Sequence, residues 1–177
     1  MEKWDLMDAQ GNATGRTIVR GERLLAGQYH LVVHIWVVDD AGHLLIQKRA
    51  PWLRLMPNTW AATGGSAVAG EDSETAARRE LAEELGLLTA PGELTYMGRL
   101  RRRNSHCDLW LLRAAPKVES LHLQREEVAR AMWVSRERLM DMVHCRRFHN
   151  YGRTYFRFLF HHIYREDDPA YVDRLVD

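Results

Sequence analysis

The sequence predicts an α/β fold in which helices cover both faces of a mixed β-sheet. Three observations lead to this prediction. Apolar runs within residues 29–49 indicate two strands, and residues 73–85 indicate a helix with suitable residues at both ends. Aromatic residues recur at three- and four-residue intervals within 151–166, as in an amphipathic helix. No regular βαβ alternation is present, which favours a mixed sheet over a parallel one.

In chain order, the first element is a polar lead-in at residues 4–19, with a turn at DAQGNATG. The run YHLVVHIWVVDDAGHLLIQKR (29–49) follows, with a turn at DDAGH that predicts a hairpin. An aromatic loop containing proline, APWLRLMPNTWAATGG (50–65), then leads into another short strand.

The helix predicted over residues 73–85 has the clearest boundaries. Asp72 or Ser73 is suited to cap its N-terminus, and Gly86 is placed to end it. An apolar stripe of Leu81, Leu85 and Leu88 is expected to pack on the sheet. Beyond it we expect two strands within 93–114, a strand at 125–135 ending near Trp133, a helix at 136–144 and the C-terminal helix. The last segment, residues 147–177, is therefore predicted to be helical.

Length and composition indicate one domain, with residues 1–28 as an extension packed on it. The chain has 177 residues, of which 46% are hydrophobic and 28% charged, as in ordinary globular proteins. Its net charge of +1 argues against nucleic acid or membrane as a partner. Two cysteines form no metal-type pair, and the start MEKWDLMDAQGN has no apolar core, so we expect a cytoplasmic location.

The helix at 73–85 concentrates negative charge on one side. Glu80, Glu83 and Glu84 stand at i, i+3 and i+4, and like charges at this spacing repel one another. A hard divalent cation such as Mg²⁺ relieves the repulsion, because it prefers oxygen ligands. Arg79, four residues before Glu83, is placed to hold that carboxylate. A solvated acidic surface is the usual alternative, but it leaves Glu71 and the preceding glycine pair unexplained.

Together these residues resemble the Nudix box. Gly65 is followed after five residues by Glu71, and after seven more by RELAEELGL (79–87). The resemblance implies an α/β/α sandwich and a hydrolase that needs Mg²⁺ or Mn²⁺ and acts on a diphosphate linked to another moiety. By position it assigns the metal to Glu80, Glu83, Glu84 and the carbonyl of Gly64. It also implies that Arg79 orients a glutamate and that Glu71 supports the loop.

Catalysis in such an enzyme needs a group that deprotonates water for attack on phosphorus. The resemblance gives Glu83 and Arg79 catalytic parts through the metal site. It also points to Glu127, six residues before Trp133, where some members carry a catalytic or metal-binding glutamate. Glu126 is the second choice, and exposed charges at a strand edge are an equally acceptable interpretation of both.

The N-terminal half also resembles isopentenyl-diphosphate isomerases, which share this fold. Those enzymes use a cysteine immediately before the box glycine, and this chain has Gly64 there. They also use metal-binding histidines; His30 matches one, but Arg23 and Ser66 stand where others are expected. Because glycine cannot replace a cysteine acid or base, hydrolysis is favoured.

Substrate recognition is predicted for Arg49, Arg54, Trp52 and His30. Guanidinium groups match phosphate oxygens, and Trp52 is suited to stack on a base or cover an apolar tail. Trp60 is expected in the core. The run RLRRRN (99–104) is interpreted as a solvated hairpin tip, with an RNA-binding regulator as the alternative.

The sequence therefore predicts a Nudix-type pyrophosphohydrolase acting on a small diphosphate compound, with nucleotides favoured. An isomerase-like enzyme and a non-catalytic module are the alternatives. A homodimer is the one assembly that we predict as an option.

Overall fold

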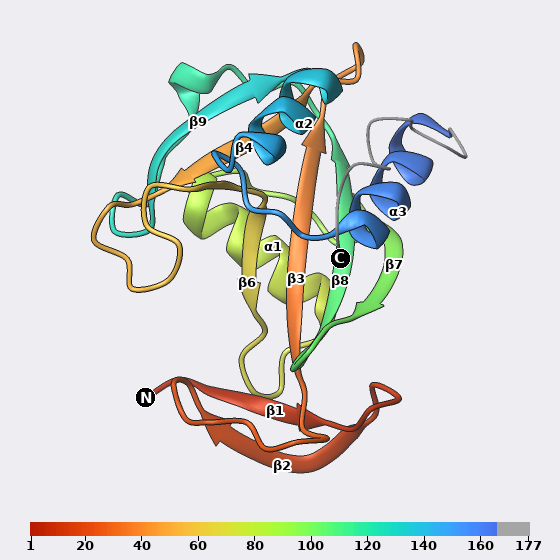
Figure 1. Ribbon diagram of the computed structural model, residues 1–177. Helices are drawn as coiled ribbons and strands as arrows, with labels where there is room; N and C mark the ends of the chain where they lie inside the picture. Colours follow the sequence, from red (N-terminus) through yellow and green to blue (C-terminus); the bar gives the residue numbers. More distant parts are fainter. Residues whose placement is uncertain (166–177) are drawn as a thin grey trace.

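A computed structural model describes residues 1–165 of the chain, and Figure 1 shows the arrangement of its elements. The strands are β1 (Lys3–Met7), β2 (Ala13–Val19), β3 (His30–Val38), β4 (Leu44–Arg49), β5 (Trp60–Ala61), β6 (Thr63–Ser66), β7 (Thr95–Arg101), β8 (Ser105–Arg113) and β9 (Val128–Val134). The helices are α1 (Ser73–Leu85), α2 (Arg136–His144) and α3 (Arg153–Tyr164), with a short 3₁₀ turn, η1 (Val118–Ser120).

The main sheet has seven strands and is mixed. Its principal order is β5-β4-β3-β8-β7, with β6 paired to β3 and β9 paired to β4. The central pair, β3 and β8, is parallel, whereas the other pairs are antiparallel. The hairpin predicted at 29–49 forms, but β3 and β4 pair only near its turn, at Val37 and Val38. Farther down, β6 takes the place beside β3.

Helices cover both faces of this sheet (Figure 1). Alternate residues of β3 point to opposite faces because successive side chains of a strand alternate. Val33, Ile35 and Val37 pack in one core cluster with α1, and Trp36 and Val38 pack in the other with α2 and α3. The predicted α/β/α arrangement is confirmed. Trp60, which was expected in the core, is buried in the second cluster, and Cys107 is buried there too.

The N-terminal segment differs from its prediction. Residues 4–19 were expected to be a polar lead-in, but β1 and β2 form a separate two-stranded sheet. The predicted turn is present, since the Asp8 carboxylate accepts hydrogen bonds from the amides of Gln10 and Asn12. Strand β2 is largely exposed, so it lacks the apolar alternation by which strands are recognised in a sequence.

This two-stranded sheet contacts the loop that precedes α1. Gly70 donates its amide hydrogen to the Asp5 carboxylate at 2.7 Å, and the Ala69 amide donates to the Lys3 carbonyl at 2.8 Å. The Trp4 ring stacks on His30, with centroids 4.2 Å apart. The extension is thus attached to the segment that leads into the acidic helix.

The C-terminal helix α3 forms within the segment predicted as helical, and residues 166–177 of that segment lie outside the described residues. In residues 1–165, no helix is long and apolar enough to cross a membrane. One predicted packing residue is wrong: Leu88 was expected to continue the apolar stripe of α1, but it is 87% exposed. The helix ends at Leu85, and Gly86 adopts a left-handed conformation.

Candidate active site

Helix α1 begins and ends as its sequence predicts. The Asp72 side chain accepts a hydrogen bond from the Thr75 amide at 2.7 Å and is therefore the N-cap. Ser73, the alternative cap, instead accepts a hydrogen bond from the Trp110 indole at 2.9 Å. The first contact sets where the helix starts, and the second attaches it to β8. Both contacts lie at the N-terminus of α1, which is thereby fixed to the sheet.

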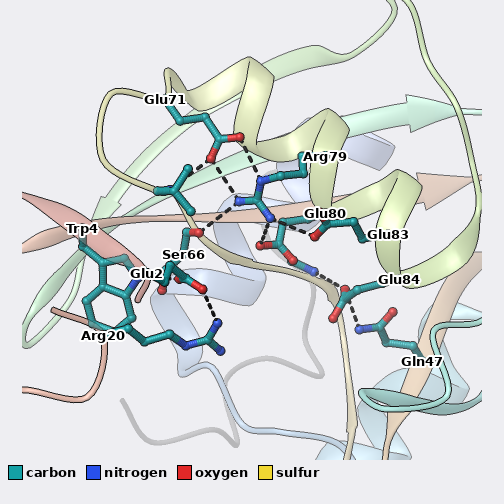
Figure 2. A network of polar contacts seen from close by, with 12 residues as sticks. Glu2, Trp4, Arg20, Gln47, Ser66, Glu71, Arg79, Glu80, Glu83 and Glu84 are labelled. Carbon is teal, nitrogen blue, oxygen red and sulfur yellow. Dashed lines mark hydrogen bonds and ion pairs between the residues drawn. The ribbon is translucent and has the colours of Figure 1, made fainter.

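The three glutamates of α1 have different environments. We call Glu80, Glu83 and Glu84 the acidic face (Figure 2). The Glu83 side chain is half exposed, whereas Glu80 is largely buried and Glu84 is only 2% exposed. A solvated acidic surface does not bury two of its three carboxyl groups. The alternative interpretation of the sequence therefore does not fit this geometry.

Arg79 connects the acidic face to the loop before the helix (Figure 2). Its guanidinium makes two hydrogen bonds to Glu71, at 2.9 and 3.0 Å, and one each to Glu80 and Glu83, at 2.9 and 3.0 Å. It also donates to the Ser66 carbonyl at 3.2 Å. The predicted pair with Glu83 is present. Glu71, which was expected to support the loop, accepts a hydrogen bond from the Val68 amide at 3.0 Å and also pairs with Arg79. The Arg79 guanidinium thus orients the carboxylates of Glu80 and Glu83.

Glu84 is held from the other side by strand residues. One of its oxygens accepts hydrogen bonds from the Gln47 side chain at 2.8 Å and from the Gly64 amide at 3.0 Å. Gln47 in turn accepts a hydrogen bond from the Thr63 hydroxyl at 3.1 Å. Sequence reasoning missed Gln47, although a polar residue within the apolar strand LLIQKR is a signal that a buried partner is needed.

Burial and mutual repulsion disfavour the charged forms of two glutamates. Burial raises the pKa of Glu84 to about 8, and the charges of Glu80 and Glu127 add to the effect. Burial also raises the pKa of Glu80, against the opposing charge of Arg79. Glu127 is half buried just before β9, and its charge acts on both carboxyl groups. The structure thus brings Glu127 close to the acidic face.

The donor atoms suit a hard cation. Within residues 1–165, one carboxylate oxygen of each glutamate of the acidic face accepts hydrogen bonds and the other oxygen accepts none. Oxygen donors of this kind match Mg²⁺ or Mn²⁺, which usually retain water molecules for phosphate oxygens to replace. No three acidic, histidine or cysteine side chains of the described residues converge on one point. Water or substrate oxygens would therefore complete the coordination.

Two glycines bring β6 close to its neighbours. A Cβ on Gly65 would lie 2.5 Å from an oxygen of Glu80, so the missing side chain makes room for that carboxylate. A Cβ on Gly64 would lie 2.0 Å from the carbonyl oxygen of Val33 in the paired strand, and its φ is +145°. No L-residue fits at position 64 without moving the backbone.

The predicted substrate residues lie in different settings. Arg49, at the end of β4, is half buried and donates to the Leu55 carbonyl at 3.1 Å. Arg54 is exposed in the following loop. Trp52 is 68% exposed, and its indole donates to the Glu126 carbonyl at 2.9 Å, beside Glu127. His30 is buried against Trp4, and its buried Nδ1 has no hydrogen-bond partner among residues 1–165.

A second arginine approaches the acidic face from the N-terminal sheet, and sequence reasoning missed it. Arg20 forms a 2.7 Å ion pair with Glu2, which also accepts a hydrogen bond from Trp4 (Figure 2). Glu2 raises the pKa of Arg20, with smaller contributions from Glu127 and Glu80. Only the folding of β1 and β2 brings this pair to the site, and no spacing in the sequence indicates it.

Comparisons with known proteins agree with one another. A family model described as NUDIX domain matches residues 28–157. The uncharacterized Nudix hydrolase lmo0368 of Listeria monocytogenes is 39% identical over 78% of this chain and 83% of its own length. An isopentenyl-diphosphate Delta-isomerase of Nocardia farcinica is 33% identical over 73% of this chain and 77% of its own.

Among solved structures, DR0079 from Deinococcus radiodurans has a similar fold. Its TM-score is 0.76, and the match covers 93% of this chain and all of that protein at 22% identity. A MutT protein from Methanosarcina mazei has a TM-score of 0.58 at 22% identity, over 80% of this chain and 96% of that one.

Proposed function

The chain belongs to the Nudix hydrolase family, and from this premise we propose that it is a Mg²⁺- or Mn²⁺-dependent pyrophosphohydrolase. Its substrate is a small compound containing a diphosphate, with a nucleotide or nucleotide derivative favoured. The observation that carries the proposal is the acidic face. Three glutamates each have one oxygen held by a hydrogen bond, and the other is left for a cation.

The residues of the acidic face would bind metal, and the residues around them orient their carboxylates. Glu80, Glu83 and Glu84 would share two or more metal ions among them rather than converge on one, with the Gly64 carbonyl as a further donor. A bound cation neutralises phosphate charge and makes a coordinated water a stronger acid. Arg79 keeps Glu80 and Glu83 in orientation, and Gln47 does the same for Glu84.

Glu127 is the residue we propose as general base. It is half buried, and its charge already acts on Glu80 and Glu84, so it lies within electrostatic reach of the metal ligands. A carboxylate there can accept the proton of the attacking water while the phosphoanhydride bond breaks. Glu126 is exposed, and only its backbone carbonyl is engaged, by Trp52. We therefore prefer Glu127 to Glu126.

The residue at position 64 argues against isomerase activity. Some relatives are named isopentenyl-diphosphate Delta-isomerases, and the resemblance requires a cysteine where this chain has Gly64. Any Cβ at that position would meet the Val33 carbonyl oxygen at 2.0 Å. The local backbone therefore excludes the side chain that protonation of carbon would need. Hydrolysis, which requires no side chain there, remains compatible with the backbone.

Product analysis tests this proposal. The protein is incubated with Mg²⁺ and nucleoside di- and triphosphates, nucleotide sugars, dinucleoside polyphosphates and isopentenyl diphosphate, and products are identified by mass spectrometry. We expect a cleaved phosphoanhydride bond. Glu83→Gln and Glu84→Gln should each lower kcat by at least about 100-fold, because each removes a charged metal ligand.

Glu74→Gln is the matched control. Glu74 lies on the same helix, and its contact with the Gly92 amide can be kept by a glutamine oxygen. Conversion of isopentenyl to dimethylallyl diphosphate would overturn the hydrolase assignment. Unchanged turnover in both ligand variants would overturn the metal site. A homodimer also remains a prediction, to be checked by light scattering.

A further inference from the structure

Arg102 has an unusual environment for a residue of an arginine-rich hairpin tip. The run RLRRRN was interpreted as solvated, and Arg101 and Arg103 are indeed exposed. Arg102 is half buried instead, and its guanidinium lies over two aromatic rings. The centroids of Tyr151 and Tyr155 are 5.6 and 5.9 Å from it. Within residues 1–165, the ion pairs include none between Arg102 and an acidic residue.

The rings beneath Arg102 belong to a connected set of polar aromatic residues. We call His34, His149, Tyr151 and Tyr155 the aromatic cluster. The His34 ring lies 4.7 Å from Tyr151, and Tyr151 lies 4.7 Å from His149 and 4.6 Å from Tyr155. His34, His149 and Tyr151 each keep part of their surface accessible. The cluster therefore has polar side chains within reach of solvent.

Internal hydrogen bonds fix one end of the cluster. The Tyr155 hydroxyl accepts a hydrogen bond from the Trp36 indole at 2.9 Å and lies 2.8 Å from His34 Nδ1. These contacts are satisfied when Tyr155 donates its proton to Nδ1 and His34 carries its own ring proton on Nε2. His34 is then a neutral histidine whose remaining N–H is a donor.

The cluster provides no negative charge to balance Arg102. The hydrogen bond between His34 Nδ1 and the Tyr155 hydroxyl leaves His34 in a neutral tautomer. Burial lowers the pKa of His149, with contributions from Arg102 and Arg49. Both histidines are thus neutral at neutral pH, and two arginines act on them. A half-buried guanidinium without a carboxylate partner is the kind of group that an anionic ligand completes.

Tyr151 and Tyr155 pack on the α2–α3 face of the sheet and α1 packs on the other face, but both the cluster and the acidic face contact strand β6 or the residues just before it. His34 is paired in register with Gly64, and Gly64 donates its amide hydrogen to Glu84. The Tyr151 hydroxyl accepts a hydrogen bond from the Ala62 amide at 3.2 Å, two residues before Gly64. Strand β6 thus separates the acidic face from the aromatic cluster, and a small molecule that passes the edge of β6 would connect the acidic face with Arg102.

We infer that Arg102 and the aromatic cluster form a second binding subsite, which takes an anionic group, phosphate or carboxylate, carried by the substrate away from the hydrolysed bond. Arg102 supplies charge-assisted hydrogen bonds, and His34 supplies an N–H. As a subsite of the enzyme this rests on the proposed function. It predicts that preferred substrates carry a negative charge beyond the diphosphate that is cleaved.

Binding of free anions to the metal-free, full-length chain tests the inference. Inorganic phosphate and, separately, acetate are titrated while histidine ring signals are followed by NMR, with His149 assigned through His149→Gln. We expect phosphate, acetate or both to shift the His149 signals to saturation. Arg102→Gln should weaken this binding by at least about tenfold, because it removes a charge-assisted contact.

Two variants separate binding from structure. Arg103→Gln changes the neighbouring exposed arginine and should retain wild-type affinity. Arg102→Lys keeps the charge and should lose less affinity than Arg102→Gln, while backbone amide spectra verify that each variant is folded. Equal affinity in folded Arg102→Gln, or shifts confined to histidines outside the cluster, would overturn the subsite. If anion binding depends on Arg102 but no phosphoanhydride is cleaved, the proposed function fails and this anion site stands.

Discussion

Two arginines mark the two sides of β6, and they differ in what surrounds them. Arg79 is hydrogen bonded to the carboxylates of Glu71, Glu80 and Glu83. Arg102 lies over tyrosine rings, and no ion pair with an acidic residue is present within residues 1–165. The first region has more negative than positive charge, and the second has only positive charge. The difference teaches that the same side chain type orients carboxylates in one place and lies on aromatic rings, without a carboxylate partner among residues 1–165, in the other.

The largest expected difference between the regions is in stability. Arg79→Gln leaves Glu71 and Glu80 largely buried without their cation, whereas Arg102→Gln leaves only neutral groups. We expect Arg79→Gln to lower the free energy of unfolding by about 3 kcal/mol, the low end for a broken buried pair because Arg79 is 26% exposed. Arg102→Gln should cost about 1 kcal/mol, the scale of a lost cation–π contact.

Urea denaturation at neutral pH, without added metal, measures both values. Arg103→Gln is the control for the loss of one exposed charge and should change stability by less than about 0.5 kcal/mol. Equal losses for Arg79→Gln and Arg102→Gln would contradict the contrast in charge balance.

His34 of the aromatic cluster should contribute to acid sensitivity. His34 has a folded-state pKa of about 3, below the value of about 6.5 in an unfolded chain. Its contribution to stability is therefore complete above pH 6.5 and is lost as pH falls toward 3, because only the unfolded state takes up the proton. Between pH 7 and pH 5 we expect a loss of at most about 2 kcal/mol from this group. Urea denaturation at the two pH values measures it.

His34→Asn should remove this part of the pH dependence, since asparagine does not titrate but can still bond to Tyr155. His144→Asn, on the exposed side of α2, is the matched histidine control and should behave as wild type. The same pH dependence in His34→Asn and wild type would show that His34 is not a buried neutral group.

The smallest expected effect is a loss of activity in Gly65→Ala, which tests how closely Glu80 must be positioned in the acidic face. In Gly65→Ala the new Cβ would meet the Glu80 carboxylate at 2.5 Å, and that carboxylate must move away from Arg79. We expect kcat to fall by about tenfold, about 1.4 kcal/mol, with little loss of stability because the displaced atoms are the end of a side chain. Ser66→Ala, on the same strand, is the control. Full activity in Gly65→Ala would show that the position of Glu80 is unimportant.

Features that depend on neighbouring residues were predicted correctly from the sequence, whereas features that depend on residues far apart in the chain were missed. The spacing of Glu80, Glu83 and Glu84, the ends of α1 and the Arg79–Glu83 pair all depend on helical geometry, and each was read correctly. The strands β1 and β2 were missed because β2 is mostly exposed and has no apolar alternation. Leu88 was misplaced because the helix ends before it.

The tip of the β7–β8 hairpin shows the same limit. Sequence reasoning placed all its arginines in solvent, which is where most charged residues lie. Arg102 is an exception only because Tyr151 and Tyr155, about fifty positions later in the chain, fold beneath it. No pattern within the run RLRRRN distinguishes it from Arg101 or Arg103.

The sequence by itself determined the family, the acidic helix and the glycine turn before it, because these depend on residues close together in the chain and on the fixed geometry of a helix. Tertiary structure alone decided which residues complete the site. Gln47 reaches Glu84, Glu127 acts electrostatically on the acidic face, and Arg102 lies over the tyrosines of the aromatic cluster only after distant segments fold together. The physical reason is that burial and electrostatic interaction depend on distances in space. The spacing of residues along the chain does not fix these distances for residues that are far apart in the sequence.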